Sequence, residues 1–170
     1  MQSSLDYQRL AQACQQEGCI LCRLAWEDTH RYLETWKDEM FTDIDSREEL
    51  RRSQGFCNSH TWQLVQLGAS LPLAQAYRDI LTDTIEHLDH EQATRRSRWF
   101  DSRRSSLEIA PCPACQYKDQ SLKRLIATLR EALLDASFFT QFAASIGLCL
   151  PHLTLAQEIQ PMHRSAEWLP

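Results

Sequence analysis

The chain has 170 residues, a length that corresponds to one ordinary domain or two very small ones. Apolar residues make up 43% and charged residues 24%, a globular balance that argues against disorder. No apolar run approaches the roughly 20 residues that cross a bilayer, and the N-terminus lacks the features of a secretory signal. The net charge of −5 disfavours a dedicated nucleic-acid-binding protein. We therefore expect a cytoplasmic, mostly helical protein with no membrane association.

The first part of the chain predicts four successive helices. A short N-terminal helix places Cys14 on its apolar side, so we expect a buried core cysteine, with a spare-ligand or redox role as the alternative. A long helix of about 19 residues follows Cys22, because its apolar residues recur every three or four positions. A shorter helix is predicted over Ser46–Gln54, and a fourth begins at Cys57-x-x-His60.

A long helix is predicted in the middle of the chain, from Pro72 to Arg104. Its buried stripe is expected to consist of six apolar residues: Leu73, Tyr77, Ile80, Leu81, Ile85 and Leu88. Five arginines lie in Arg95–Arg104. They are either a solvated helix end or a nucleic-acid contact with Trp99 and Phe100 as stacking groups.

The last part of the chain repeats the pattern of the first. A long helix follows Cys115, a shorter one is predicted over Ser137–Ile146, and another begins at Cys149-x-x-His152. The fold class is therefore all-α: two pseudo-symmetric helical repeats, each with a Cys3His metal knuckle, joined by the long helix. The residues expected to be buried are Tyr32, Leu33, Trp36, Leu125, Ile126 and Leu129.

Six of the seven cysteines, with two histidines, form two copies of one motif. Cys19-x-x-Cys22 precedes Cys57-x-x-His60, and Cys112-x-x-Cys115 precedes Cys149-x-x-His152. Three thiols and one imidazole are a full tetrahedral set for zinc, so we predict two Zn²⁺ ions per chain, with an iron–sulfur cluster as the less favoured alternative. We expect each ion to be held within one repeat. The alternative is a swap that pairs the first Cys-x-x-Cys with the second Cys-x-x-His.

The motif is part of an internal duplication. The two Cys-x-x-Cys pairs are 93 residues apart, and the phrase Ser-x-Gly-φ-Cys-x-x-His, where φ is apolar, recurs 92 residues on. We predict a single domain of residues 1–170, made of repeats 18–70 and 107–160 with the connecting helix 71–106. The pattern resembles a little-characterised family of small bacterial proteins over residues 18–62 and 111–155. The resemblance implies a helical, cytosolic, metal-binding protein and points to the same eight residues, without lending an activity.

The sequence favours a non-enzymatic, protein-binding or adaptor module. Four protein ligands leave no zinc position for a catalytic water, and no catalytic motif occurs. An active site without a motif stays an alternative, as do a nucleic-acid-binding regulator that uses Arg95–Arg104 and a thiol-based redox or metal-responsive sensor.

The net charge becomes more negative when zinc binds. Each Cys3His zinc site changes the net charge by −1, so two sites give −5 − 2 = −7. We therefore expect a protein partner, and no strong nucleic-acid binding at physiological salt.

Overall fold

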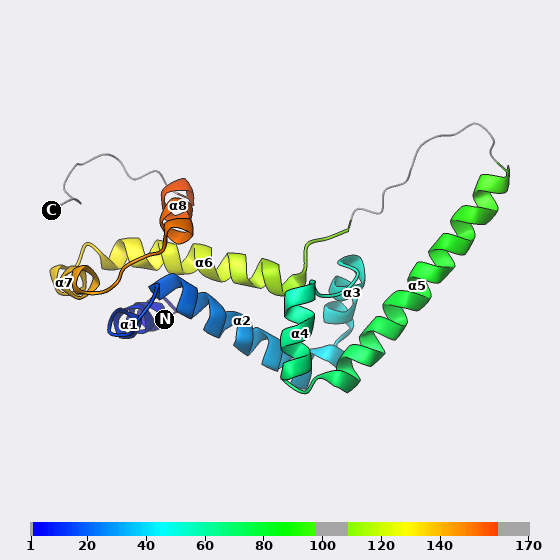
Figure 1. The fold of residues 1–170 in the computed structure, drawn as a ribbon, viewed down its shortest axis with the longest axis horizontal. Helices are drawn as coiled ribbons and strands as arrows, with labels where there is room; N and C mark the ends of the chain where they lie inside the picture. Colours follow the sequence, from blue (N-terminus) through cyan, green and yellow to red (C-terminus); the bar gives the residue numbers. More distant parts are fainter. Residues whose placement is uncertain (1, 98–108, 160–170) are drawn as a thin grey trace. The chain divides into compact units, whose positions relative to one another are not determined.

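The computed structural model describes residues 2–97 and 109–159, and these residues are predominantly helical (Figure 1). The elements in chain order are α1 (Gln2–Cys14), α2 (Ile20–Asp38), the 3-10 turn η1 (Met40–Thr42), α3 (Ile44–Arg52), α4 (Asn58–Gln66), α5 (Ser70–Ser97), α6 (Pro113–Ala132), α7 (Ala136–Ala144) and α8 (Leu150–Ile159). No strand occurs within these two stretches, which confirms the predicted all-α class. None of these helices is both long enough and apolar enough to cross a bilayer.

Each predicted helix is present close to its expected bounds. The long helices after the two Cys-x-x-Cys pairs are α2 and α6, and the shorter helices that follow them are α3 and α7. The middle helix, α5, begins at Ser70, so Pro72 lies within its first turn, where no intrahelical N–H bond is needed. The rest of the predicted connection, with Trp99 and Phe100, lies outside the described residues.

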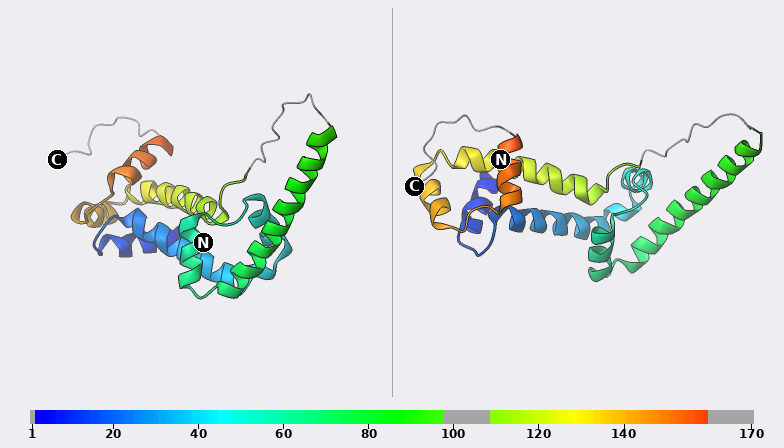
Figure 2. Two further views of the ribbon diagram at one scale, coloured as in Figure 1. Left: turned by 45° about the vertical axis from the view of Figure 1, so that its right-hand side comes forward. Right: turned by 45° about the horizontal axis from the view of Figure 1, so that its top comes forward.

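The chain divides into two compact units, and each takes residues from both halves of the sequence. Unit 1 consists of Met1–Thr29 and Lys118–Pro170, and unit 2 of His30–Tyr117. Figure 2 gives two further views of the ribbon. Each unit is described by itself.

Unit 1 packs α1, the first part of α2, most of α6, and α7 around one apolar core. Its buried residues include Leu10 on α1, Leu21 and Leu24 on α2, Leu125 and Ile126 on α6 and Phe138 on α7. Cys14 belongs to this core and is 7% exposed, as predicted, and burial raises the pKa of its thiol. Cys14 is therefore an unreactive apolar residue in this unit.

Unit 2 packs the end of α2 against α3, α4, the first half of α5 and the start of α6. Its buried residues include Leu33, Trp36, Leu50, Leu64 and Ile80. Trp36 and Phe56 meet edge to face, with ring centroids 5.0 Å apart. Of the six residues expected to be buried across both units, five are at most 3% exposed, and Tyr32 is half-buried beside the stacked ring of Tyr117.

The predicted buried stripe of α5 is correct only for the first half of that helix. Leu73 and Ile80 are each 6% exposed, but Leu81, Ile85 and Leu88 are 58%, 58% and 50% exposed. Helical periodicity identifies an apolar face without specifying what covers it. Among the described elements of unit 2, α3 and α4 are the helices that pack against α5, and Figure 1 shows them beside its first half.

Candidate metal centres

The eight predicted ligands lie in two groups of four. Centre 1 consists of Cys19, Cys22, Cys149 and His152, and centre 2 consists of Cys57, His60, Cys112 and Cys115. Within each group the ligand atoms all lie within 4.8 Å of one another. The expectation that each group would form within one repeat is therefore wrong: each centre combines the Cys-x-x-Cys of one repeat with the Cys-x-x-His of the other.

The length of α2 accounts for this exchange. The Cys19-x-x-Cys22 pair lies at the start of this helix, whose 19 residues extend about 28 Å. After α2, the chain turns at η1, and α3 packs against η1 and α5. The 9-residue α3 thus stays near the C-terminal end of α2, and the Cys57-x-x-His60 pair that follows it stays there too. A pair from the other repeat therefore completes each centre.

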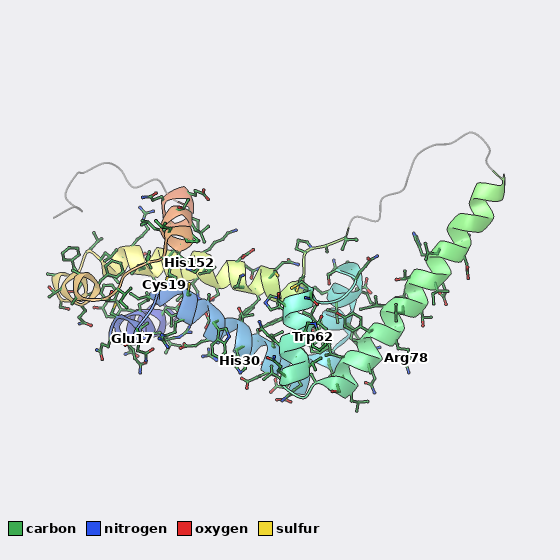
Figure 3. All side chains as sticks on the ribbon, in the orientation of Figure 1. Glu17, Cys19, His30, Trp62, Arg78 and His152 are labelled. Carbon is green, nitrogen blue, oxygen red and sulfur yellow. The ribbon has the colours of Figure 1, made fainter. Side chains whose placement is uncertain are left out.

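Centre 1 is formed where two helices begin. Cys19 directly precedes α2 and Cys22 lies in its first turn, while Cys149 directly precedes α8 and His152 lies in its first turn. Figure 3 labels Cys19 and His152. The Nδ1 atom of His152 lies 3.5 Å from the Sγ of Cys19, 3.3 Å from that of Cys22 and 3.3 Å from that of Cys149. The Sγ atoms of Cys22 and Cys149 are 3.7 Å apart. All four ligand atoms thus face one point.

Centre 2 repeats this arrangement at the starts of α4 and α6. Cys57 is the N-cap of α4, with extended backbone angles of −63° and 161°. The Nδ1 atom of His60 lies 3.2 Å from the Sγ of Cys57 and 3.5 Å from the Sγ of both Cys112 and Cys115. The Sγ atoms of Cys57 and Cys115 are 3.8 Å apart.

The shared Ser-x-Gly phrase makes the turn that leads into each Cys-x-x-His. Gly55 and Gly147 have φ values of +102° and +75°, which only glycine adopts at little cost. The hydroxyl of Ser53 donates to the carbonyls of Leu50 and Gly55, at 3.0 and 3.1 Å. The hydroxyl of Ser145 accepts from the N–H of Gly147 at 3.0 Å. These bonds hold the turns in which the second pair of ligands is presented.

Helix starts favour one thiolate in each centre. Although burial opposes ionisation, the backbone N–H groups of Cys149 and Cys22 lower the pKa of the Cys19 thiol. Burial also opposes ionisation of Cys57, but hydrogen bonds from the N–H of His60, from the thiols of Cys115 and Cys112 and from the N–H of Ser59 lower its pKa. These two thiols are the ones most readily available as thiolate ligands.

The remaining thiols of each centre limit how much negative charge the site can hold by itself. Desolvation and the neighbouring thiols of Cys149 and Cys19 raise the pKa of Cys22 to about 12. Desolvation and the thiols of Cys112 and Cys57 raise the pKa of Cys115 to about 12. A set of three thiolates is therefore unfavourable without a cation among them. A divalent cation would offset this repulsion.

The two centres differ in their access to solvent. In centre 2, His60 is only 6% exposed and the three cysteines are half-buried. In centre 1, Cys22 is exposed and His152 is half-buried. Burial, and next the charge of Lys118, lower the pKa of His152, so its imidazole stays neutral and able to act as a ligand. Reagents in solution therefore have a direct approach to centre 1 through Cys22.

A buried charge network in unit 1 was not predicted from the sequence. Asp28 is 1% exposed, accepts from Arg9 at 2.6 Å and from Arg124 at 3.3 Å, and accepts a hydrogen bond from Ser121. Arg124 also donates to Asp6 at 2.8 Å. The signal in the sequence is Asp28 within the long apolar-patterned helix, on the same face as the buried Leu24 and Ala25. This network joins α1, α2 and α6 in the unit that holds centre 1.

Comparison with known proteins places the chain in one family. Residues 1–167 match a family described as "Family of unknown function (DUF6062)". This match confirms the resemblance to a little-characterised family and extends it over nearly the whole sequence. No curated protein and no solved structure matches the chain.

Proposed function

Because the chain belongs to the DUF6062 family, whose function is unknown, we propose a function from its own residues. The protein is a small helical module that binds other proteins, and two Zn²⁺ ions stabilise its two units. Cys19, Cys22, Cys149 and His152 would hold one ion. Cys57, His60, Cys112 and Cys115 would hold the other.

The spacing of the ligand atoms carries this proposal. In a tetrahedral zinc site with Zn–S bonds of about 2.3 Å and Zn–N bonds of about 2.0 Å, two sulfurs lie about 3.8 Å apart and a sulfur and a nitrogen about 3.5 Å apart. The sulfur–sulfur distances of 3.7 and 3.8 Å, and the sulfur–nitrogen distances of 3.2–3.5 Å, fit this geometry. A multi-iron cluster would need room between its ligands, so the distances favour a single ion.

A structural role for the zinc follows from the ligand set. Each centre has four protein ligands, so a bound ion would have no open position for water or substrate. When bound, zinc supplies positive charge to the thiolates and cross-links distant segments of the chain. Centre 1 would join Cys22 to Cys149, which are 127 residues apart, and centre 2 would join Cys57 to Cys115, which are 58 apart. Closing such long loops lowers the conformational entropy of the unfolded chain, which stabilises the folded state by about 4–5 kcal/mol for a loop of about 100 residues.

Exposed apolar side chains support the protein-binding role. On α4, which begins at centre 2, Trp62 is 59% exposed and Val65 is 40% exposed. Trp62 keeps its indole N–H bonded to Asn58 at 3.0 Å, so its ring is held in place on the surface. Tryptophan is one of the residue types enriched at the energetic centres of protein interfaces.

Metal analysis with a stability measurement tests the zinc part of this proposal. The purified chain should contain about two zinc per molecule. Removal of the metal with a chelator should lower the melting temperature by more than about 10 °C, because the binding free energy is part of the folding free energy. Iron and sulfide in stoichiometric amounts, or full stability without metal, would contradict it.

For the adaptor role, a stoichiometric protein partner should be lost in the Trp62→Ala variant and kept in an Ile44→Ala control, since Ile44 is also exposed.

The exposure of Cys22 favours a second candidate function, a thiol-responsive sensor. An exposed thiolate ligand reacts with oxidants or electrophiles more readily than a buried one. Loss of metal from centre 1 at low oxidant concentration, accompanied by a change in partner binding, would support the sensor over the simple adaptor.

A further inference from the structure

The second half of α5 carries an apolar stripe that no described residue covers. It consists of Leu81, Ile85 and Leu88, which are 58%, 58% and 50% exposed. Spacings of four and three residues place these side chains on one face of the helix. We call these three residues the α5 stripe.

The α5 stripe continues the apolar face of Leu73 and Ile80 along the helix, beyond the part of α5 that unit 2 covers. Asp79 and Asp83 form ion pairs with Arg47 and Arg51 of α3, the latter with a distance of 2.7 Å between Arg51 Nη2 and Asp83 Oδ1. At about 100° per residue, these two aspartates lie on the side of the helix roughly opposite the stripe. Figures 1 and 2 show α5 continuing beyond α3 and α4 within this unit. Among the described residues of unit 2, nothing therefore covers the stripe.

We propose that the α5 stripe is the interface of a homodimer, in which the α5 helices of two copies of this chain pack antiparallel. Charges at the two ends of the stripe favour this partner and this direction. Arg78 precedes the stripe. Its guanidinium is paired with Asp79 of the same helix at 3.0 Å, but its side chain is 74% exposed, and Asp89 follows the stripe and is exposed. These residues are eleven apart, about three helical turns, so they lie on the same side of the helix.

Antiparallel packing brings Arg78 of one copy to Asp89 of the other, twice, by the two-fold symmetry of the pair. In a parallel pair the two copies of Arg78 would lie at one height and the two copies of Asp89 at another, so neither charge would meet an opposite charge. The same surface thus supplies both an apolar centre and complementary charges at its ends. This self-complementarity selects a second copy over an unrelated partner.

The size of the stripe sets the expected strength of the dimer. Three half-exposed side chains on each copy bury less area than the roughly 1,200–2,000 Å² of a standard stable interface. We therefore expect a reversible dimer with a dissociation constant in the micromolar range.

Sedimentation velocity of the full zinc-loaded chain, from about 1 to 300 µM with reductant present, tests the dimer. The wild type should change from monomer to dimer within this range. Ile85→Glu and Leu88→Glu should each raise the dissociation constant at least about tenfold, because a carboxylate would be buried at the interface. Ile44→Glu is the matched control: Ile44 is 81% exposed in the same unit but lies on α3, so dimerisation should be unchanged. Circular dichroism checks that each variant keeps its helicity.

A charge exchange tests the direction of packing. Arg78→Glu and Asp89→Arg should each weaken the dimer, and the double variant should restore it. A chain that stays monomeric at every concentration would overturn the proposal. So would a dimer insensitive to Ile85→Glu and Leu88→Glu, or a double variant that fails to restore association.

Discussion

The backbone N–H of Ile20 donates a 3.4 Å hydrogen bond to the carbonyl of Gly147, and this bond directly joins the two ligand-bearing loops of centre 1. In the duplication the counterpart of Ile20 is Pro113, which has no N–H to donate. Centre 2 uses a different bond, from the N–H of Ala110 to the carbonyl of Arg52, at 3.1 Å. The two centres therefore share their ligand types but are supported differently, so we expect changes near them to have unequal effects.

The exchanged pairing of ligands predicts how metal content responds to double substitution. The Cys22→Ser/Cys149→Ser variant should retain about one zinc per chain, because both residues belong to centre 1. The Cys22→Ser/Cys57→Ser variant should retain almost none, because it damages both centres. Elemental analysis of the two purified variants, with each single variant as a control at about one zinc, makes the measurement. Almost no zinc in the Cys22→Ser/Cys149→Ser variant, with about one zinc in the Cys22→Ser/Cys57→Ser variant, would instead show that each ion is held within one repeat.

The two turn glycines predict different costs for the same substitution. At Gly147 an added Cβ meets nothing within 4 Å, so Gly147→Ala should cost only the backbone strain of positive φ, about 1–2 kcal/mol in unfolding free energy. At Gly55 the Cβ would lie 2.7–2.8 Å from the ring and hydroxyl of Tyr77. That hydroxyl is fixed by bonds to Thr61 at 2.9 Å and to the carbonyl of Phe56 at 3.2 Å. Gly55→Ala should therefore cost about 1–3 kcal/mol more.

Chemical denaturation of both glycine variants in the zinc-loaded state measures this difference. Gly55→Ala should also weaken metal retention at centre 2, since Cys57 follows the turn by two residues. Equal losses of stability in the two variants would show that contact with Tyr77 carries no weight.

The exposure of Cys22 predicts which metal leaves first. With a thiol-reactive reagent and a zinc indicator, release should occur in two phases, and the faster phase should come from centre 1, because Cys22 is exposed while the imidazole of centre 2 is 6% exposed. The Cys22→Ser variant should lack the fast phase. Persistence of that phase in this variant, or its loss in Cys57→Ser instead, would contradict the assignment.

The buried carboxylate of Asp28 predicts a pH-dependent contribution to stability. Burial alone would raise its pKa, but the hydrogen bonds and charges of Arg9, Ser121 and Arg124 lower the pKa below its ordinary value. A lowered folded-state pKa means that the stabilisation is full above the unfolded pKa of about 4 and is lost as the pH falls through the folded value. At pH 7, Asp28→Asn should cost about 2–4 kcal/mol, because it leaves two arginines beside an uncharged group.

Unfolding of wild type and Asp28→Asn, compared pH by pH, measures this contribution and cancels any loss of metal common to both. The difference in unfolding free energy should be constant from pH 7 to about 5 and should shrink below about pH 4. Asp119→Asn, at an exposed position on the same helix as Ser121, serves as the control and should change stability by less than about 0.5 kcal/mol. A difference independent of pH would contradict the role of the charge.

Local signals in the sequence were sufficient for the helices and for the eight candidate ligands. The spacing of apolar residues after Cys22 and Cys115 predicted α2 and α6, because side chains three and four residues apart share a helical face. Each Cys-x-x-Cys and Cys-x-x-His is a local pattern at a helix start, so the ligands could be recognised without knowing what they face. The buried position of Cys14 likewise followed from the periodicity of α1.

Only the tertiary structure decided which ligands meet and which apolar faces are covered. Spacing along the chain allowed either pairing of the motifs, and the choice depends on where a rigid helix of about 28 Å carries the chain before it turns. The ion pairs of Asp28 depend on Arg9 and Arg124, which are 19 and 96 residues away and leave no periodic signal. The apolar pattern of α5 continues without a break from Leu73 to Leu88, but burial ends after Ile80, because packing depends on neighbours that periodicity does not encode.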